Sequence, residues 1–305
     1  GYNNLANAYG TLLFQMNGTT AANTTRFYYV YFDEAAHGNK AAPSYPAAIN
    51  FSQDGDEFHV NNSNYWFSID TSRGQNTSGI YRVRGLVSPF NPLFESGPSQ
   101  MTAAYTQLSD GVFNYSFNFT GNVSLKNGPV RLTINMTGNE AFWNQPTNYT
   151  NAGRMTKVYR FYSKLGWTMI EMNYTNTAGS SITRNSTESG AIAFDVSDLF
   201  PRGWGGFLSR GNFTDPFSWV HGNDPGASFS LGIINLQENG TSNFSARNNS
   251  AFGRIGLHLN ATTISAGSSI ADKTLLQFDQ ADADFTAFER FRNSWADREN
   301  VTETP

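Results

Sequence analysis

The side chains best suited to contact a sugar lie in turns between the predicted strands. Trp204 stands among glycines, and Trp219 and His221 belong to the run Trp219-Val220-His221-Gly222-Asn223. Aromatic faces suit the C–H surfaces of pyranose rings, and an imidazole can donate or accept a proton near neutral pH. We take Trp204, Trp219 and His221 as the candidate ligand-binding residues, while packing in a core is the commoner use of tryptophan.

The sequence shows no catalytic pair. Of the other histidines, His37 lies in a turn, and His59 and His258 lie on the predicted outward faces of strands, without a carboxylate partner on a neighbouring predicted strand. The chain has no cysteine, which excludes thiol nucleophiles, cysteine–zinc sites and cysteine-bound iron cofactors. The glycine-rich run at 202–206 lacks the Lys-Ser/Thr of a phosphate-binding loop. We predict no catalytic residue, so an enzyme is the less favoured class.

Two acidic clusters contain oxygen donors of the type that calcium binds. The first is Asp54-Gly55-Asp56-Glu57, and the second combines Asp279 with Asp282 and Asp284. Neither cluster has the spacing of an EF-hand, and the second suits the first turn of a helix. The sequence therefore predicts no metal site and no cofactor, with calcium as the one ion left open.

The most unusual feature of the sequence is polarity without charge. Charged residues make up 14% of the chain, against about 25% in typical soluble domains. Of 34 asparagines, 18 stand in Asn-X-Ser/Thr, where chance placement gives about six. This motif is the acceptor for N-glycosylation. It predicts covalent N-glycans at Asn17, Asn23, Asn50, Asn61, Asn76, Asn114, Asn118, Asn122, Asn135, Asn148, Asn173, Asn185, Asn212, Asn239, Asn243, Asn248, Asn260 and Asn300.

Such a composition predicts an extracellular protein, either secreted or held at the cell surface. Many glycosylation motifs without a single disulfide favour an archaeal type of surface protein. The net charge of -4 provides no basic field for nucleic acid. No run of about 18 apolar residues occurs, and the first residues lack the features of a signal peptide, so we expect neither a transmembrane segment nor an export signal in this chain.

Short apolar or alternating runs bounded by Gly, Asn, Pro and Ser recur about every 10 to 15 residues, which predicts an all-β fold. Residues 1–50 are expected to form an N-terminal β-hairpin (10–16 with 26–33), part of a small sandwich, and a linker. Residues 51–305 are expected to form one large antiparallel β-sandwich. Phe285, Phe288, Phe291 and Trp295 recur at helical spacing, which predicts one short C-terminal helix that packs its aromatic face on a sheet.

Strand alternation tests the glycosylation hypothesis, because successive side chains point to opposite faces and a glycan cannot lie in a core. The predicted inward set of the strand at 111–120 is Phe113, Tyr115, Phe117 and Phe119. The same reasoning places six motif residues on outward faces: Asn61, Asn114, Asn118, Asn135, Asn173 and Asn260. The other twelve are predicted to lie in or beside polar turns.

Two stretches resemble the galactose mutarotase-like supersandwich domain, which occurs in aldose epimerases, several polysaccharide lyases and the C-terminal part of some α-mannosidases. The first runs from Phe58 to Asp70 and continues in Gly79-Ile80-Tyr81-Arg82-Val83, like the family's opening hairpin. The second is Lys126-Asn127-Gly128-Pro129-Val130-Arg131-Leu132-Thr133, similar to the family's Gly-Pro-Val-Arg strand start. The resemblance covers about residues 57 to 280 and implies the supersandwich fold.

Three hypotheses about function follow. The favoured one is a non-enzymatic, heavily N-glycosylated structural protein that self-associates into a surface layer or an extracellular filament, with Tyr9 to Met16 added as a β-strand to a neighbouring subunit. The alternative, implied by the resemblance, is a carbohydrate-binding or carbohydrate-active domain, lyase-like or epimerase-like, of a secreted protein. A surface protein of a virus that infects such a host is the third.

Overall fold

The computed structural model describes residues 21, 23–28, 46–47, 49–62, 65–71, 79–85, 103–105, 108–142, 145–163, 165–186, 192–195, 206–210, 219–224, 229–236, 242–248, 253–259, 261–279, 288, 290 and 293. Within these residues the chain forms twenty β-strands, and every strand pair is antiparallel. The prediction of an all-β, antiparallel fold is confirmed.

The strands form three sheets. The first has the order β1 (Asn50–Asp54), β2 (Glu57–Asn61), β3 (Tyr65–Asp70) and β4 (Gly79–Gly85). The main sheet runs through β14 (Gly206–Arg210), β15 (Trp219–Asp224), β16 (Phe229–Asn235), β20 (Ser269–Asp279), β11 (Trp167–Asn176), β10 (Gln145–Tyr162), β9 (Arg131–Phe142), β7 (Asn114–Asn118), β6 (Leu108–Ser109), β12 (Ile182–Ser186) and β19 (Thr262–Ile264), with β8 (Val123–Asn127) also paired to β9. The third is β17 (Ser242–Asn248), β18 (Gly253–Leu259), β13 (Ile192–Asp195) and β5 (Ala103–Tyr105).

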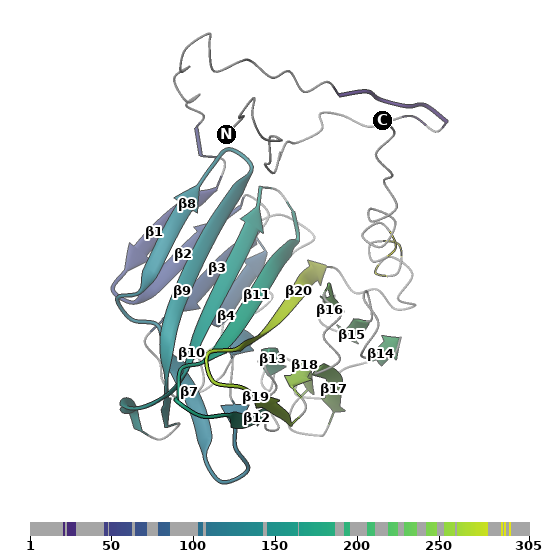
Figure 1. The fold of residues 1–305 in the computed structure, drawn as a ribbon. Helices are drawn as coiled ribbons and strands as arrows, with labels where there is room; N and C mark the ends of the chain where they lie inside the picture. The colour runs from purple at the N-terminus through teal and green to yellow at the C-terminus, as the bar shows by residue number, and fades with distance from the viewer. Residues whose placement is uncertain are drawn as a thin grey trace, which may run out of the picture.

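The first sheet packs face to face on the centre of the main sheet (Figure 1). The core between them holds large aromatic and aliphatic side chains from both layers, and the rings of Phe67 on β3 and Phe161 on β10 lie 4.9 Å apart, centroid to centroid. Burial of this apolar surface is the main favourable term in folding. The core therefore fixes which face of each central strand points outward.

Strand β9 shows how alternation positions the outer face of the main sheet. Leu132, Ile134 and Met136 are fully buried, whereas the residues between them are half-exposed. Strand β11 follows the same rule, with Ile170 and Met172 buried and Asn173 exposed. The predicted inward and outward faces of these two strands are confirmed.

A second apolar cluster covers part of the outer face near β15 and β16. Phe288 is buried there, 5.2 Å from the Trp219 ring between centroids and packed over Gly232, where an added Cβ would lie 2.0 Å from the Phe288 ring. Residues 288, 290 and 293 have helical backbone. Phe288 packs on the sheet as predicted, whereas the helix as a whole and its other predicted aromatic residues lie outside the described part of the chain and stay a prediction.

One expectation about the strands is wrong, and a second falls mostly outside the described residues. Phe113 is 53% exposed rather than inward, because β7 begins only at Asn114 and Phe113 belongs to the preceding turn. Of the two predicted strands of the N-terminal hairpin, only residues 26–28 are described, and they are not in a strand. The rest of those two strands lies outside the described residues.

Candidate functional site

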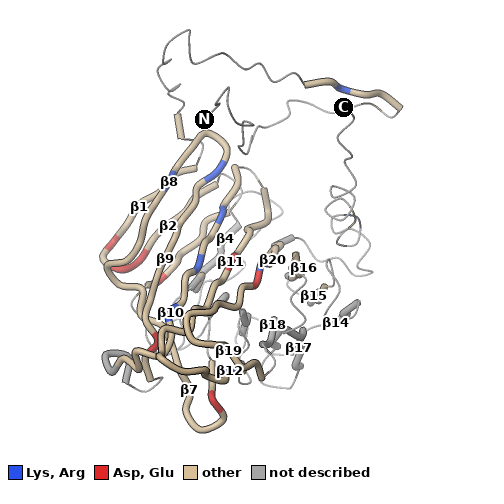
Figure 2. Tube along the Cα trace, viewed as in Figure 1, with Lys and Arg blue, Asp and Glu red and all other residues tan. Residues whose placement is uncertain are grey.

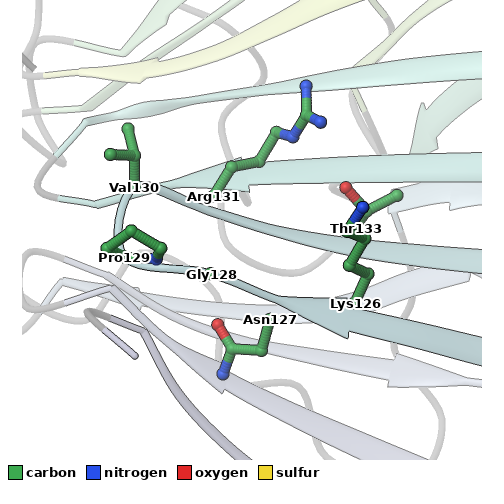
Figure 3. Close-up of a pocket in the computed structure, with 7 residues that line it drawn as sticks. All are labelled: Lys126, Asn127, Gly128, Pro129, Val130, Arg131 and Thr133. Atoms are coloured by element: carbon green, nitrogen blue, oxygen red, sulfur yellow. The ribbon is translucent and has the colours of Figure 1, made fainter. Parts of the chain in front are cut away.

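A small pocket opens at the turn between β8 and β9, in the second stretch that resembles the mutarotase-like domain. We call it the β8–β9 pocket. Its volume is about 180 Å³, and it is lined by Lys126, Asn127, Gly128, Pro129, Val130, Arg131 and Thr133 (Figure 3). Sites for drug-sized ligands usually measure about 300–1,000 Å³. The β8–β9 pocket therefore fits one small group, such as a single sugar unit.

Hydrogen bonds hold this turn in place. The Gly128 N–H donates to the Arg131 carbonyl at 3.0 Å, and the Ser163 N–H donates to the Val130 carbonyl at 3.0 Å. Asn127 Nδ2 donates to the Ile49 carbonyl at 2.9 Å, which ties the turn to the segment just before β1. Because the walls are fixed by the fold, a ligand would lose little free energy to ordering of the site.

The two cations of the β8–β9 pocket have no acidic partner among the described residues. Within the described part of the chain, neither Lys126 nor Arg131 forms an ion pair, and Figure 2 shows no acidic position at their turn. Arg160, which is opposite Thr133 in the strand register, is instead paired with Glu171 at 2.8 Å. The pocket is thus a local positive site on a chain of net charge -4, and it favours anions.

A buried ion pair lies toward the other end of β9. Glu140 accepts two hydrogen bonds from the Arg184 guanidinium, at 2.7 and 3.1 Å, and both side chains are buried. The Tyr174 hydroxyl and the Thr150 hydroxyl donate to the same carboxylate. The Arg184 guanidinium also lies 4.4 Å from the centre of the Tyr115 ring. Every group in this cluster is paired, which indicates a structural role.

The cluster continues to the surface through Asp110. The Tyr115 hydroxyl donates to one oxygen of Asp110, and the N–H groups of Val112 and Phe113 donate to the other at 2.9 and 2.8 Å. Burial alone would raise the pKa of Asp110, but these hydrogen bonds outweigh it and lower that pKa. Burial and the bond to Asp110 raise the pKa of Tyr115. Neither group exchanges its proton near neutral pH, so the cluster anchors the turn.

Lys157 lies on the inward face of β10 and is fully buried, with its ammonium 5.5 Å from the centre of the Phe119 ring. Burial lowers the pKa of Lys157 to about 7. The signal for its burial is present in the sequence, because Lys157 occupies every second position together with Tyr159 and Phe161 and therefore shares their face of the strand. A fully buried amine cannot reach a ligand at the surface, so we do not place it in a binding site.

Sequence reasoning also missed a polar cluster on the outer face of the first sheet. His59 Nδ1 lies 3.5 Å from Glu57 Oε1, and the Ser68 hydroxyl donates to that same carboxylate. The His59 ring stacks on Trp66 at 5.2 Å between centroids. The serine donates to the carboxylate rather than to the imidazole, which is not the order of a catalytic triad. The spacing of Glu57 and His59 by two residues in one strand was the available signal.

The predicted ligand-binding residues on β15 are part of a core instead. Trp219 and His221 are 2% and 1% exposed, and both pack on Phe288. Burial lowers the pKa of His221 to about 3, so its imidazole stays neutral. Neither ring offers an open face to a ligand, because Phe288, distant in sequence, covers them. Trp204 lies outside the described residues.

The predicted calcium clusters gain no support. Asp54 and Glu57 face each other in the β1–β2 register, yet no group of three or more potential metal ligands occurs among the residues that the structure describes. Asp279 ends β20, and Asp282 and Asp284 lie outside the described residues. No helix in the described part of the chain is long and apolar enough to cross a membrane.

Nine motif asparagines have described side chains, and none of them is buried. The five exposed ones are Asn23, Asn50, Asn114, Asn122 and Asn173. The four half-exposed ones are Asn61, Asn118, Asn135 and Asn185. Five of the twelve that were expected in or beside turns lie within strand bounds: Asn50 in β1, Asn148 in β10, Asn185 in β12, and Asn243 and Asn248 in β17. Whether glycans are attached stays a prediction.

Comparison with known proteins returns no family model and no curated protein that matches the sequence. Solved structures do match. They include an α-galactosidase from Geobacillus stearothermophilus, with 10% identity, a TM-score of 0.48 and coverage of 74% of this chain and 41% of that one. A putative aldose 1-epimerase from Klebsiella pneumoniae has 10% identity, a TM-score of 0.45 and coverage of 82% and 88%. A galactose mutarotase-like protein from Clostridium acetobutylicum has 8% identity, a TM-score of 0.46 and coverage of 77% and 99%.

The chain spans only 42% and 40% of two further α-galactosidase chains. With identities of 8 to 10% and TM-scores below 0.5, the matches carry no argument about activity, substrate or partner. The function is therefore inferred from the residues and geometry of the β8–β9 pocket.

Proposed function

We propose that this chain is a carbohydrate-binding β-sandwich domain of an extracellular glycoprotein and that its ligand occupies the β8–β9 pocket. The observation that carries the proposal is a preformed pocket of about 180 Å³ whose two cations, Lys126 and Arg131, have no ion-pair partner among the described residues. Thr133 adds a hydroxyl, and Pro129 and Val130 add apolar surface. A few polar groups on an apolar wall are typical of small-ligand sites.

The pocket supports binding rather than turnover. A glycoside-cleaving or epimerising site needs a positioned acid and base, and the residues that line this pocket include no carboxylate and no imidazole. The nearest carboxylate in the strand register, Glu171, is engaged by Arg160 and Lys273. We therefore assign the pocket a non-catalytic role.

Calorimetric titration with oligosaccharides of galactose, glucose, mannose and uronic acids tests this proposal. Gly128 lines the pocket, and a Cβ there would meet only the Arg131 carbonyl, at an ordinary 3.6 Å. The Gly128→Leu variant should therefore fold and lower the affinity for the bound sugar by about tenfold or more. Gly179→Leu, in an open turn, is the matched control and should bind normally. Absence of binding by the unmodified chain, or equal binding by Gly128→Leu, would reject the pocket as the site.

A self-associating structural glycoprotein is the second candidate. The supporting observation is that none of the nine described motif asparagines is buried, so glycans at those positions would face solvent. The β-strand to be added to a neighbour, Tyr9 to Met16, lies outside the described residues. Electron microscopy and intact mass of the native material test this candidate. A monomer at the unmodified mass of 33.7 kDa would reject it, and unchanged assembly after deletion of residues 1–16 would reject the strand exchange.

A further inference from the structure

We propose that the sugar unit held in the β8–β9 pocket carries a carboxylate, as a uronic acid does. This inference rests on the proposed carbohydrate-binding function and names the substrate class of that site. Arg131 presents a planar fork of N–H donors that matches the two oxygens of a carboxylate, and Lys126 adds a second positive charge from the facing strand. Neutral sugars would leave both charges uncompensated.

The position of the two cations in the hairpin supports one shared anion. Lys126 is opposite Thr133 in the register of β8 and β9, and Arg131 lies two residues from Thr133 on the same face of β9. Figure 3 shows Lys126 beside Thr133, with Arg131 on the neighbouring part of β9. Both charges therefore reach the same side of the hairpin, where a carboxylate could contact each while the sugar ring lies on Pro129 and Val130.

The charges next to the pocket support the assignment of a carboxylate ligand. Arg160, next along the outer face, is neutralised by Glu171, and Glu171 also holds Lys273 at 3.4 Å. Arg160 and Lys273 are thus paired on central strands, whereas Lys126 and Arg131, at the pocket, have no ion-pair partner among the described residues. Like charges placed together without a carboxylate repel one another, and an anionic ligand would remove that repulsion.

The experiment is calorimetric titration of the full chain with the trisaccharide of galacturonic acid, with its methyl ester and with sodium sulfate. The acid trisaccharide should bind at least about tenfold more tightly than the ester, and its affinity should fall as sodium chloride rises from roughly 50 to 500 mM. Lys126→Ala and Arg131→Ala should each weaken the acid trisaccharide about fivefold or more. Lys273→Ala removes a paired cation and serves as the control that leaves affinity unchanged.

Each outcome is decisive. Equal affinity for the acid and its ester overturns the carboxylate assignment and leaves the proposed carbohydrate binding in place. Sulfate that binds as tightly as the acid trisaccharide also overturns it, because the pocket then takes a free inorganic anion. Failure of both trisaccharides and of every other oligosaccharide rejects the proposed function itself. Retained affinity in both alanine variants, with folding verified by circular dichroism, overturns the role of Lys126 and Arg131.

Discussion

Two arginines on the main sheet differ in their burial and in their partners. Arg184 is buried and donates two hydrogen bonds to Glu140, which also accepts from Tyr174 and Thr150. Arg131 is half-exposed at a turn and has no carboxylate partner among the described residues. The first arginine completes a set of satisfied groups, whereas the second leaves its donors to solvent or to a ligand.

The difference separates charges that hold the fold from charges that are free to bind. A buried ionisable group must be paired or give up its charge, because desolvation costs several kcal/mol per ion. An exposed charge contributes about 0 to 1 kcal/mol to stability when paired and can remain unpaired at little cost. Mutations in the two regions should therefore affect different quantities: the free energy of unfolding for the Arg184 cluster, and ligand affinity for the β8–β9 pocket.

The largest effect is expected for Glu140→Ala. This change leaves the Arg184 guanidinium buried without its carboxylate, so the free energy of unfolding should fall by about 3–5 kcal/mol. Urea denaturation followed by circular dichroism measures it. The double variant Glu140→Leu with Arg184→Met removes both charges and should recover most of the loss. A loss below about 1 kcal/mol in the single variant would contradict the structural role of the pair.

The next effect concerns Lys157, whose pKa burial lowers to about 7 from 10.5. Between these values the unfolded chain holds a proton that the folded chain has released, so stability should rise as pH increases from about 7 to 9.5. Lys157→Met should flatten this rise and stabilise the protein at pH 6 by about 1–3 kcal/mol. Denaturation at several pH values tests it, with Lys273→Met as an exposed control. A rise that survives in Lys157→Met would assign it to another group.

A smaller effect is expected for Glu171, whose carboxylate is paired with a cation close to the pocket. Glu171→Gln breaks the half-exposed pair with Arg160 and should cost about 0.5–1 kcal/mol of unfolding free energy. The same change frees Arg160, which is opposite the pocket residue Thr133, so affinity for the galacturonic trisaccharide should rise about two- to threefold. Calorimetry compares the two proteins. Weaker binding by Glu171→Gln would show that Arg160 does not act on the pocket.

The smallest effect on stability is expected at the pocket itself. Arg131→Ala removes a half-exposed side chain without an ion-pair partner among the described residues, so the free energy of unfolding should change by no more than about 0.5 kcal/mol. Urea denaturation measures this change beside that of Glu140→Ala. A loss above about 2 kcal/mol would place Arg131 among the groups that hold the fold.

Much of the architecture follows from local patterns in the sequence. Alternation in β9 and β11 predicts which residues are buried, since one face of each strand packs on the first sheet. The same alternation places Glu140 and Lys157 on the inward faces of β9 and β10, but only the structure shows how the fold accommodates these charged residues. Their burial depends on partners distant in the chain, such as Arg184 on β12, which no local pattern reveals.

The site residues were harder to predict for the same reason. Trp219 and His221 stand among turn residues in sequence, yet Phe288, more than sixty residues later, buries both. The stretch from Lys126 to Thr133 was recognisable only as a strand start. Only the positions of Glu171 and the other described carboxylates show that two of its cations have no ion-pair partner among the described residues.

The most direct test of the central claim is to map the bound sugar by nuclear magnetic resonance. Amide signals of the isotopically labelled chain are recorded while the galacturonic trisaccharide is added. The largest shifts should fall on the β8–β9 hairpin, at Lys126, Asn127, Gly128 and Arg131, with little change at Glu140 or Trp219. Shifts centred on β15 or on the face that carries Trp66, or no shifts at saturating sugar, would contradict the claim.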